Sequence, residues 1–133
     1  MEQLAKAVLL DTTVLIDLFR GKEKAADFIE QECNTKRLLA ISIVSTMELI
    51  VGCRNKIEVD KSQQLIAEFS VVQILPTISA QAYNLLVNYS KSHGLLIPDA
   101  LIAATAMIYD MELATDNLRD FLILPGLHGY KPY

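Results

Sequence analysis

Short apolar runs alternate with helical segments along this chain, and this alternation restricts the fold more than any other feature. Runs typical of buried strands occupy residues 7–10, 39–43, 71–75 and 113–115. Helical patterns occupy residues 13–19, 24–32, 45–51, 61–69, 80–92, 98–109 and the turn 118–121. Strands that alternate with helices form parallel sheets with helices on both faces. The pattern therefore predicts a three-layer α/β/α domain around a central parallel sheet.

Capping residues mark several of the expected helix ends. Ser45 is expected to be the N-cap of the helix over 45–51, with Glu48 three residues later completing a capping box. Pro98 predicts the start of the helix over 98–109, and Gly94 predicts the end of the helix before it.

Three carboxylates, Asp11, Glu48 and Asp99, stand almost alone in apolar surroundings, and a fourth, Asp116, follows a short apolar run. Asp11 ends the first apolar run, and Asp116 follows the last one. Glu48 and Asp99 are each the only charge in a stretch of 14 residues. A carboxylate taken out of water costs several kcal/mol unless it is paired or binds a metal. Because no basic residue recurs beside these four acids, we expect a divalent metal ion as their shared partner.

The expected fold brings the four acids to one edge of the sheet. Asp11 and Asp116 each follow a strand, Glu48 lies one turn into a helix after a strand, and Asp99 opens a helix. Ligands of open parallel sheets gather at the carboxyl ends of the strands. Carboxylates without Cys or His neighbours favour Mg²⁺ or Mn²⁺ over zinc. A site of this kind is suited to phosphodiester hydrolysis.

Each acid also has a purely structural explanation. Asp11, Asp99 and Asp116 lie where helices could begin, and Asp is favoured at such positions. Glu48 could reach back to the Ser45 amide in the capping box. Capping and metal binding are compatible, and the joint occurrence of four such acids favours the metal site.

Length and composition limit the remaining classes of protein. With 133 residues, 52% hydrophobic and 21% charged, the chain is expected to form one folded domain over residues 1–133. No apolar stretch is long enough to span a membrane, and the N-terminus leaves no room for a signal peptide, so a cytoplasmic protein is expected. Cys33 and Cys53 are expected to be reduced thiols in the core.

The charge balance leaves a nucleic-acid partner open. The net charge of −4 arises from 12 basic and 16 acidic residues, so setting aside the four candidate ligands leaves 12 acids against 12 bases. Basic clusters at 20–24, 36–37 and 54–56 are either solvated surface or a rim that contacts phosphates. The apolar helix over 98–109 and a groove expected near 13–19 predict a homodimer and a bound peptide partner.

Four segments together resemble the PIN-domain family and, within it, the VapC-type toxins of toxin–antitoxin pairs. The segments are residues 9–17, 41–52, 93–106 and 113–127. They cover nearly the whole chain in the family's order and spacing. The resemblance implies a PIN-like fold and an endoribonuclease that depends on Mg²⁺ or Mn²⁺. It also implies a VapB-like antitoxin that inserts a peptide segment near the active site.

The resemblance also implies roles for individual residues. It assigns metal binding and catalysis to Asp11, Glu48, Asp99 and Asp116. It gives supporting roles to Thr12, Thr115, Asn117 and Asp120, of which Asn117 or Asp120 could share the fourth acidic position. As a mechanism, we expect Asp11, Asp99 and Asp116 to hold one ion while Glu48 orients a second ion or the attacking water. In-line attack would leave 5′-phosphate and 3′-hydroxyl products.

Other classes of function fit the sequence less well. A response-regulator receiver requires an Asp after the third strand, where residues 71–75 are followed by Pro76. An aspartyl-phosphate phosphatase requires a second Asp at the position of Thr13. A PIN-like RNA- or protein-binding module without catalysis, and a DNA-directed nuclease of the same fold, remain as alternatives.

Overall fold

The computed structural model describes residues 6–133 of the chain, which form strands that alternate with helices. The strands are β1 (Val8–Leu10), β2 (Leu39–Ser42), β3 (Ser70–Val72), β4 (Glu112–Ala114) and β5 (Gly129–Tyr130). The helices are α1 (Thr12–Phe19), α2 (Glu23–Asn34), α3 (Ile43–Val51), α4 (Lys56–Ile66), α5 (Pro76–His93), α6 (Ile97–Ile108) and the short 3₁₀ helix η1 (Leu118–Asp120).

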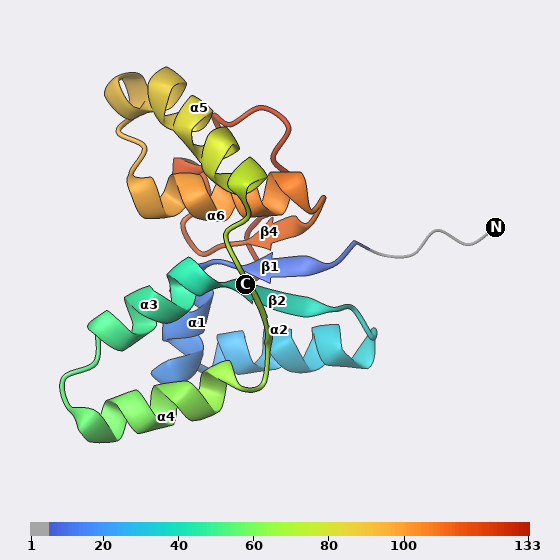
Figure 1. The fold of residues 1–133 in the computed structure, drawn as a ribbon. Coiled ribbons are helices and arrows are strands. Elements are labelled where there is room, and N and C mark those ends of the chain that lie inside the picture. Colours follow the sequence, from blue (N-terminus) through green and yellow to red (C-terminus); the bar gives the residue numbers. More distant parts are fainter. Residues whose placement is uncertain (1–5) are drawn as a thin grey trace.

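The strands form one sheet in the order β3-β2-β1-β4-β5, and all four pairings are parallel. Helices α5 and α6 cover one face, while α1, α2, α3 and α4 lie on the other (Figure 1). The predicted three-layer α/β/α architecture is therefore confirmed.

The chain order makes the end of β1 a switch point. From β1 the chain adds β2 and then β3 on one side, and it returns to add β4 and β5 on the other. The crevice between the carboxyl ends of β1 and β4 is where ligands bind in sheets of this topology. The Asp11 amide donates to the Ala114 carbonyl at 2.9 Å, which joins the two strand ends.

The core lies on both faces of β1, because all three of its residues are fully buried. Leu9 packs into the cluster beneath α5 and α6, whereas Val8 and Leu10 pack into the cluster with α1 and α2. A strand covered on both faces is apolar at every position. This burial explains why the first apolar run is continuous rather than alternating.

The start of α3 differs from the sequence prediction. The helix begins at Ile43, and the hydroxyl of Ser42 accepts from the Val44 amide as its N-cap. Ser45 is fully buried inside the first turn, so the expected capping box of Ser45 and Glu48 is wrong. Two serines three residues apart present the same local signal, and the strand that ends at Ser42 decides between them.

Several other boundaries shift by a few residues. Helix α4 starts at Lys56 rather than 61, because the Asn55 side chain accepts from the Glu58 amide. Helix α5 starts at Pro76 rather than 80, and it ends as predicted at Gly94, whose φ of 69° suits glycine. Strand β3 spans Ser70–Val72 rather than 71–75, and β5 was not predicted.

The cysteines do not lie in the core as expected. Cys33 is exposed and Cys53 is half-buried, and both are free thiols. Among residues 6–133, no helix combines the length and the apolar character required to cross a membrane.

Candidate active site

Asp11 lies at the end of β1 with only 3% of its surface exposed. It occupies the N-cap position of α1, but its side chain makes no capping hydrogen bond. Its Oδ2 instead accepts from the hydroxyls of Thr13 at 3.0 Å and Thr115 at 2.7 Å. Burial raises the pKa of Asp11, and these two hydroxyl donors partly oppose that rise. The capping explanation therefore does not account for this carboxylate.

Backbone amides fix the direction of both hydroxyl groups. The Asn117 amide donates to Thr115 Oγ1 at 3.0 Å, and the Asp116 amide donates to Thr13 Oγ1 at 3.1 Å. Each hydroxyl therefore has its proton free for the carboxylate. Both hydroxyl protons go to Oδ2 of Asp11, so this carboxylate oxygen is held in a fixed direction.

Glu48 is held by a threonine hydroxyl that does not contact Asp11, that of Thr12. It lies in α3, one turn and a half beyond β2, and is partly exposed. The Thr12 hydroxyl donates to Glu48 Oε1 at 2.7 Å and also lies 2.8 Å from the buried Ser45 hydroxyl. The supporting role expected for Thr12 and Thr115 thus has a geometric basis, since Thr12 contacts one candidate acid and Thr115 another.

Asp99 lies in the first turn of α6, two residues after Ile97, which opens the helix. Burial raises its pKa to about 6, and the negative charges of Asp11, Glu48 and Asp120 add to the effect. Asp11 beyond β1 and Glu48 on α3 therefore lie close enough for their charges to act on Asp99 of α6 at the carboxyl edge of the sheet. Among residues 6–133, none of these three carboxylates has an ion-pair partner.

The fourth acidic region, around Asp116, is more exposed than the surroundings of Asp11. Asp116 is partly exposed, and its Oδ1 lies 3.8 Å from Lys131 Nζ. The expectation that no basic residue lies beside the four acids is therefore wrong for Asp116. Asn117 donates from Nδ2 to Asp120, which lies in η1 and is exposed. It is Asp120, rather than Asp116, whose charge contributes to the raised pKa of Asp99.

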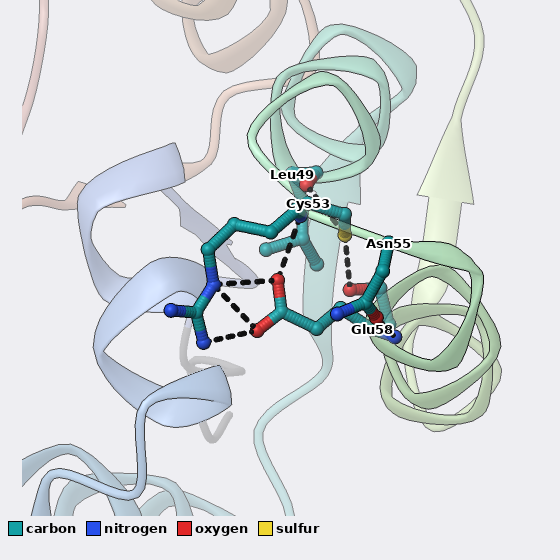
Figure 2. A network of polar contacts seen from close by, with 6 residues as sticks. Leu49, Cys53, Asn55 and Glu58 are labelled. Atoms are coloured by element: carbon teal, nitrogen blue, oxygen red, sulfur yellow. Dashed lines mark hydrogen bonds and ion pairs between the residues drawn. The ribbon is translucent and has the colours of Figure 1, made fainter.

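A cavity of about 370 Å³ lies beside Glu48, between α1, α3 and the start of α4. Figure 2 shows the polar network beside this cavity, in which the Arg54 guanidinium donates to both oxygens of Glu58 and the Cys53 thiol contacts Ser62. The Arg54 charge is therefore paired with Glu58, although 84% of its side chain is exposed.

The basic clusters predicted as surface or rim are partly structural. The Arg37 side chain is 15% exposed and pairs with Glu32 and Glu112, so it is not part of a solvated rim. Lys36 is exposed and lies at the opposite, amino edge of the sheet, before β2.

The acids lie along one edge of the sheet, but among the described residues they do not form a complete metal site of three or more side chains. Within residues 6–133, no three His, Cys, Asp or Glu side chains converge closely enough to hold a metal ion by themselves. The available donors are carboxylate oxygens, which suit Mg²⁺ or Mn²⁺, and Mg²⁺ usually keeps several of its waters. Asp11, Glu48 and Asp99 are the residues that could hold such an ion.

The sequence prediction missed three residues of this edge: Thr13, Ser45 and Lys131. Thr13 and Ser45 contact residues on other elements, and their local sequence carries no signal for that. Lys131 was missed because strand β5, which places it, spans only two residues.

Comparison with known proteins shows where this fold belongs. Residues 8–124 match the PIN domain. Ribonuclease VapC10 of Mycobacterium tuberculosis (strain ATCC 25618 / H37Rv) is 38% identical over 126 residues, which cover 94% of this chain and 91% of the relative.

Solved structures agree with the sequence match. A toxin–antitoxin complex from Klebsiella pneumoniae contains a chain with a TM-score of 0.75 and 31% identity, covering 96% of this chain and 98% of that one. A DNA-bound VapBC structure from Salmonella typhimurium gives a TM-score of 0.81 at 21% identity, covering 97% and 100%. The family resemblance noted in the sequence is confirmed, and from β1 to the segment beyond η1 this chain belongs to the PIN-domain family.

Proposed function

We propose that this protein is a metal-dependent endoribonuclease and the toxin of a VapBC-type toxin–antitoxin pair, with one nuclease domain over residues 1–133. The single observation that carries the proposal is the environment of Asp99. Its carboxyl is half-buried, its pKa is raised to about 6, and the charges of Asp11 and Glu48 act on it without a paired cation. The 38% identity to Ribonuclease VapC10 supports RNA as the substrate.

The proposed ion is Mg²⁺ or Mn²⁺, held by Asp11, Glu48 and Asp99. Their oxygen donors fit these hard cations, and an ion would relieve the repulsion among the three carboxylates. When bound, such an ion lowers the pKa of its water and stabilises negative charge on a phosphate.

The chain's own contribution is orientation. Thr13 and Thr115 hold Oδ2 of Asp11, so the orientation of this carboxylate is fixed before a ligand binds. Thr12 fixes Oε1 of Glu48 in the same way. Hydrogen bonds of this kind to ligating carboxylates tune both metal affinity and activity.

For the fourth position we propose Asp116, with Asp120 and Asn117 as the alternatives. Asp116 is linked to Asp11 through Thr13, because the Asp116 amide donates to the hydroxyl that contacts Asp11. Asp120 is supported by its effect on the pKa of Asp99. Asp116→Asn and Asp120→Asn distinguish experimentally which of these two acids binds the ion.

The proposed partners are an antitoxin peptide, a second copy of the chain and RNA, all in the cytoplasm. The Klebsiella pneumoniae relative was solved as a toxin–antitoxin complex, which supports an antitoxin partner here. The cavity beside Glu48 offers room for a peptide side chain. Exposed apolar residues support a homodimer, namely Met47, Val51, Tyr83, Val87, Leu96 and Ile97.

The test is cleavage of total cellular RNA by the purified protein with Mg²⁺, with Mn²⁺ and with EDTA, beside Asp99→Asn. We expect discrete cuts that require the metal and disappear in the variant. Sequencing the new ends gives the target and shows whether they carry 5′-phosphates.

Three results would contradict the proposal. Cuts that persist at the wild-type level in folded Asp99→Asn would exclude this site as their source. Cleavage of single-stranded or duplex DNA in place of RNA would favour the DNA-directed nuclease. A folded protein that binds metal and RNA without cleaving either nucleic acid would favour the binding module.

A further inference from the structure

Building on the proposed ribonuclease function, we infer that Lys131 binds a backbone phosphate of the RNA next to the scissile bond. RNA is a polyanion, and it has to approach an edge that carries Asp11, Glu48 and Asp99. Phosphates beyond the reach of a metal ion need cations of the protein at the rim. Lys131 lies at this rim, in a cavity of about 280 Å³ that Asp116, Asn117 and Arg119 also line.

The backbone of Lys131 is fixed by the residues on both sides of it. Tyr130 ends strand β5, and its carbonyl accepts from the Thr115 amide at 3.1 Å. Tyr133 donates its hydroxyl proton to Asp17 on α1 at 2.5 Å, and its ring packs edge-on against Phe28. This segment, residues 129–133, is called the C-terminal strap below.

The strap also places Lys131 in register with the candidate site. Tyr130 pairs with Ala114 across the sheet, so Lys131 lies opposite the start of the segment that carries Thr115 and Asp116. Thr115 in turn contacts Asp11. Only β4 lies between β5, which precedes Lys131, and β1, which precedes Asp11, so the fold determines the position of Lys131 relative to the most buried acid of the site.

The charge of Lys131 remains available for a ligand. Its distance of 3.8 Å from Asp116 is long for an ion pair, and 58% of its side chain is exposed. Exposed pairs of this kind contribute about 0–1 kcal/mol, so a phosphate can replace the carboxylate as partner. Arg37 differs from it, because its side chain is 15% exposed and pairs with Glu32 and Glu112. Arg54 differs in geometry and not in burial, because its side chain is 84% exposed but its guanidinium donates to both oxygens of Glu58 at 2.9 to 3.4 Å.

The first test uses a synthetic oligoribonucleotide that spans a cut mapped in cellular RNA. We expect Lys131→Gln to raise KM about tenfold with kcat within about twofold, because a phosphate contact made equally before and during cleavage is lost. Lys131→Arg should restore the wild-type KM. Lys36→Gln is the matched control, because it removes an equal charge at the opposite edge of the sheet and should change neither constant.

A second test is independent of cleavage. A short labelled RNA of random sequence is titrated onto Asp99→Asn, with and without Lys131→Gln, between roughly 50 and 200 mM KCl. We expect the Lys131 change to weaken binding several-fold and to reduce the salt slope by about one, as for one lost phosphate contact. If RNA binds in this way but is never cut, the ribonuclease function fails while the role of Lys131 stands.

The strap provides a third test through non-additivity. Tyr133→Phe removes the hydroxyl that contacts Asp17 but keeps the ring on Phe28. We expect it to raise KM about two- to threefold in the wild type and to have no effect in the Lys131→Gln background, since the two changes act on one contact.

The inference is overturned if Lys131→Gln binds and cleaves RNA like the wild type at every salt concentration. It is equally overturned if this variant cleaves faster, because Lys131 would then act only as the counter-ion that restrains Asp116.

Discussion

Asp11 and Asp116 each follow a strand of the same sheet, yet their carboxylates lie in opposite environments. Asp11 is 3% exposed and held by two hydroxyl groups from different elements. Asp116 is partly exposed and faces a lysine at 3.8 Å. One side of the site is therefore pre-organised by the fold, whereas the other is in contact with solvent and can exchange its partners.

This difference indicates that the two sides of the site have different roles, ion binding on one side and substrate entry on the other. A rigid buried carboxylate suits the position that fixes an ion, because its orientation costs nothing at the moment of binding. An exposed acid beside an exchangeable cation suits the side where a large substrate enters and leaves. The following experiments measure how far the two sides differ.

The largest effect is expected from Asp11→Asn. The neutral amide keeps the size of the side chain but removes the charge that a cation needs, so cleavage should fall at least about a hundredfold. Cleavage of the mapped oligoribonucleotide in Mg²⁺ is the measurement. Asp110→Asn changes an exposed Asp that pairs with Lys6 and should cleave normally. Equal activity of the two variants would remove Asp11 from the site.

Asp116→Asn and Asp120→Asn test the solvated side. Each is expected to lose about ten- to hundredfold in cleavage or metal affinity, less than Asp11→Asn. NMR titration of Asp99 separates them, because Asp120→Asn should lower the Asp99 pKa while Asp116→Asn should leave it in place. The variant with the larger loss of Mn²⁺ affinity identifies the fourth ligand. Losses equal to that of Asp11→Asn would mean that the two sides do not differ.

A smaller effect is expected from Thr115→Val, which removes one hydroxyl donor from Asp11 at constant shape. The carboxylate loses a fixed orientation and its pKa rises further, so cleavage should fall about tenfold. The buried Thr105 is the matched control, since its hydroxyl donates to Leu101 within α6 and Thr105→Val should leave cleavage unchanged. An unchanged rate in Thr115→Val would show that the hydroxyl contact has no part in activity.

The smallest effect concerns stability in EDTA. The Asp99 pKa is about 6 in the folded protein and 3.8 in its ordinary state, so the folded chain binds more protons between these values. Stability therefore decreases as the pH rises from about 4 to about 6, and the loss is complete above that range. Asp11 acts in the same direction, because burial raises its pKa as well.

Asp99→Asn removes the larger part of this pH dependence. We expect it to stabilise the metal-free protein by about 1–2 kcal/mol at neutral pH, less than the full shift because the group is partly exposed. Urea unfolding at several pH values measures the change. Stability that rises with pH in the wild type over this range would contradict the assignment.

The sequence singles out the candidate acids on the buried side of the site more clearly than those on the exposed side. Asp11, Glu48 and Asp99 could be proposed from the sequence because an isolated charge in an apolar run is costly and therefore informative. Asp116 and Asp120 lie in a polar segment, where charges carry no such cost and local sequence cannot distinguish them.

Local sequence patterns could not predict contacts between elements that are far apart in the sequence. Thr13 is only two residues from Asp11, but Thr115 is 104 positions away, and nothing in the sequence near Thr115 indicates that its hydroxyl reaches Asp11. The layers and the parallel sheet could be predicted, because they follow from the order of apolar runs. The exact ends of α3 and α4 could not, because neighbouring side chains compete for each cap.

The hydrogen bond from Thr115 to Asp11 joins residues 104 positions apart. Contacts of such separation form late in folding, because a long loop has to close before they contribute free energy. Until β4 pairs with β1, Asp11 has neither its Thr115 donor nor the Asp116 region beside it. The nuclease site therefore forms only when β4 has joined the sheet, so a partly folded chain lacks it and a growing chain does not acquire it before β4 has been synthesised.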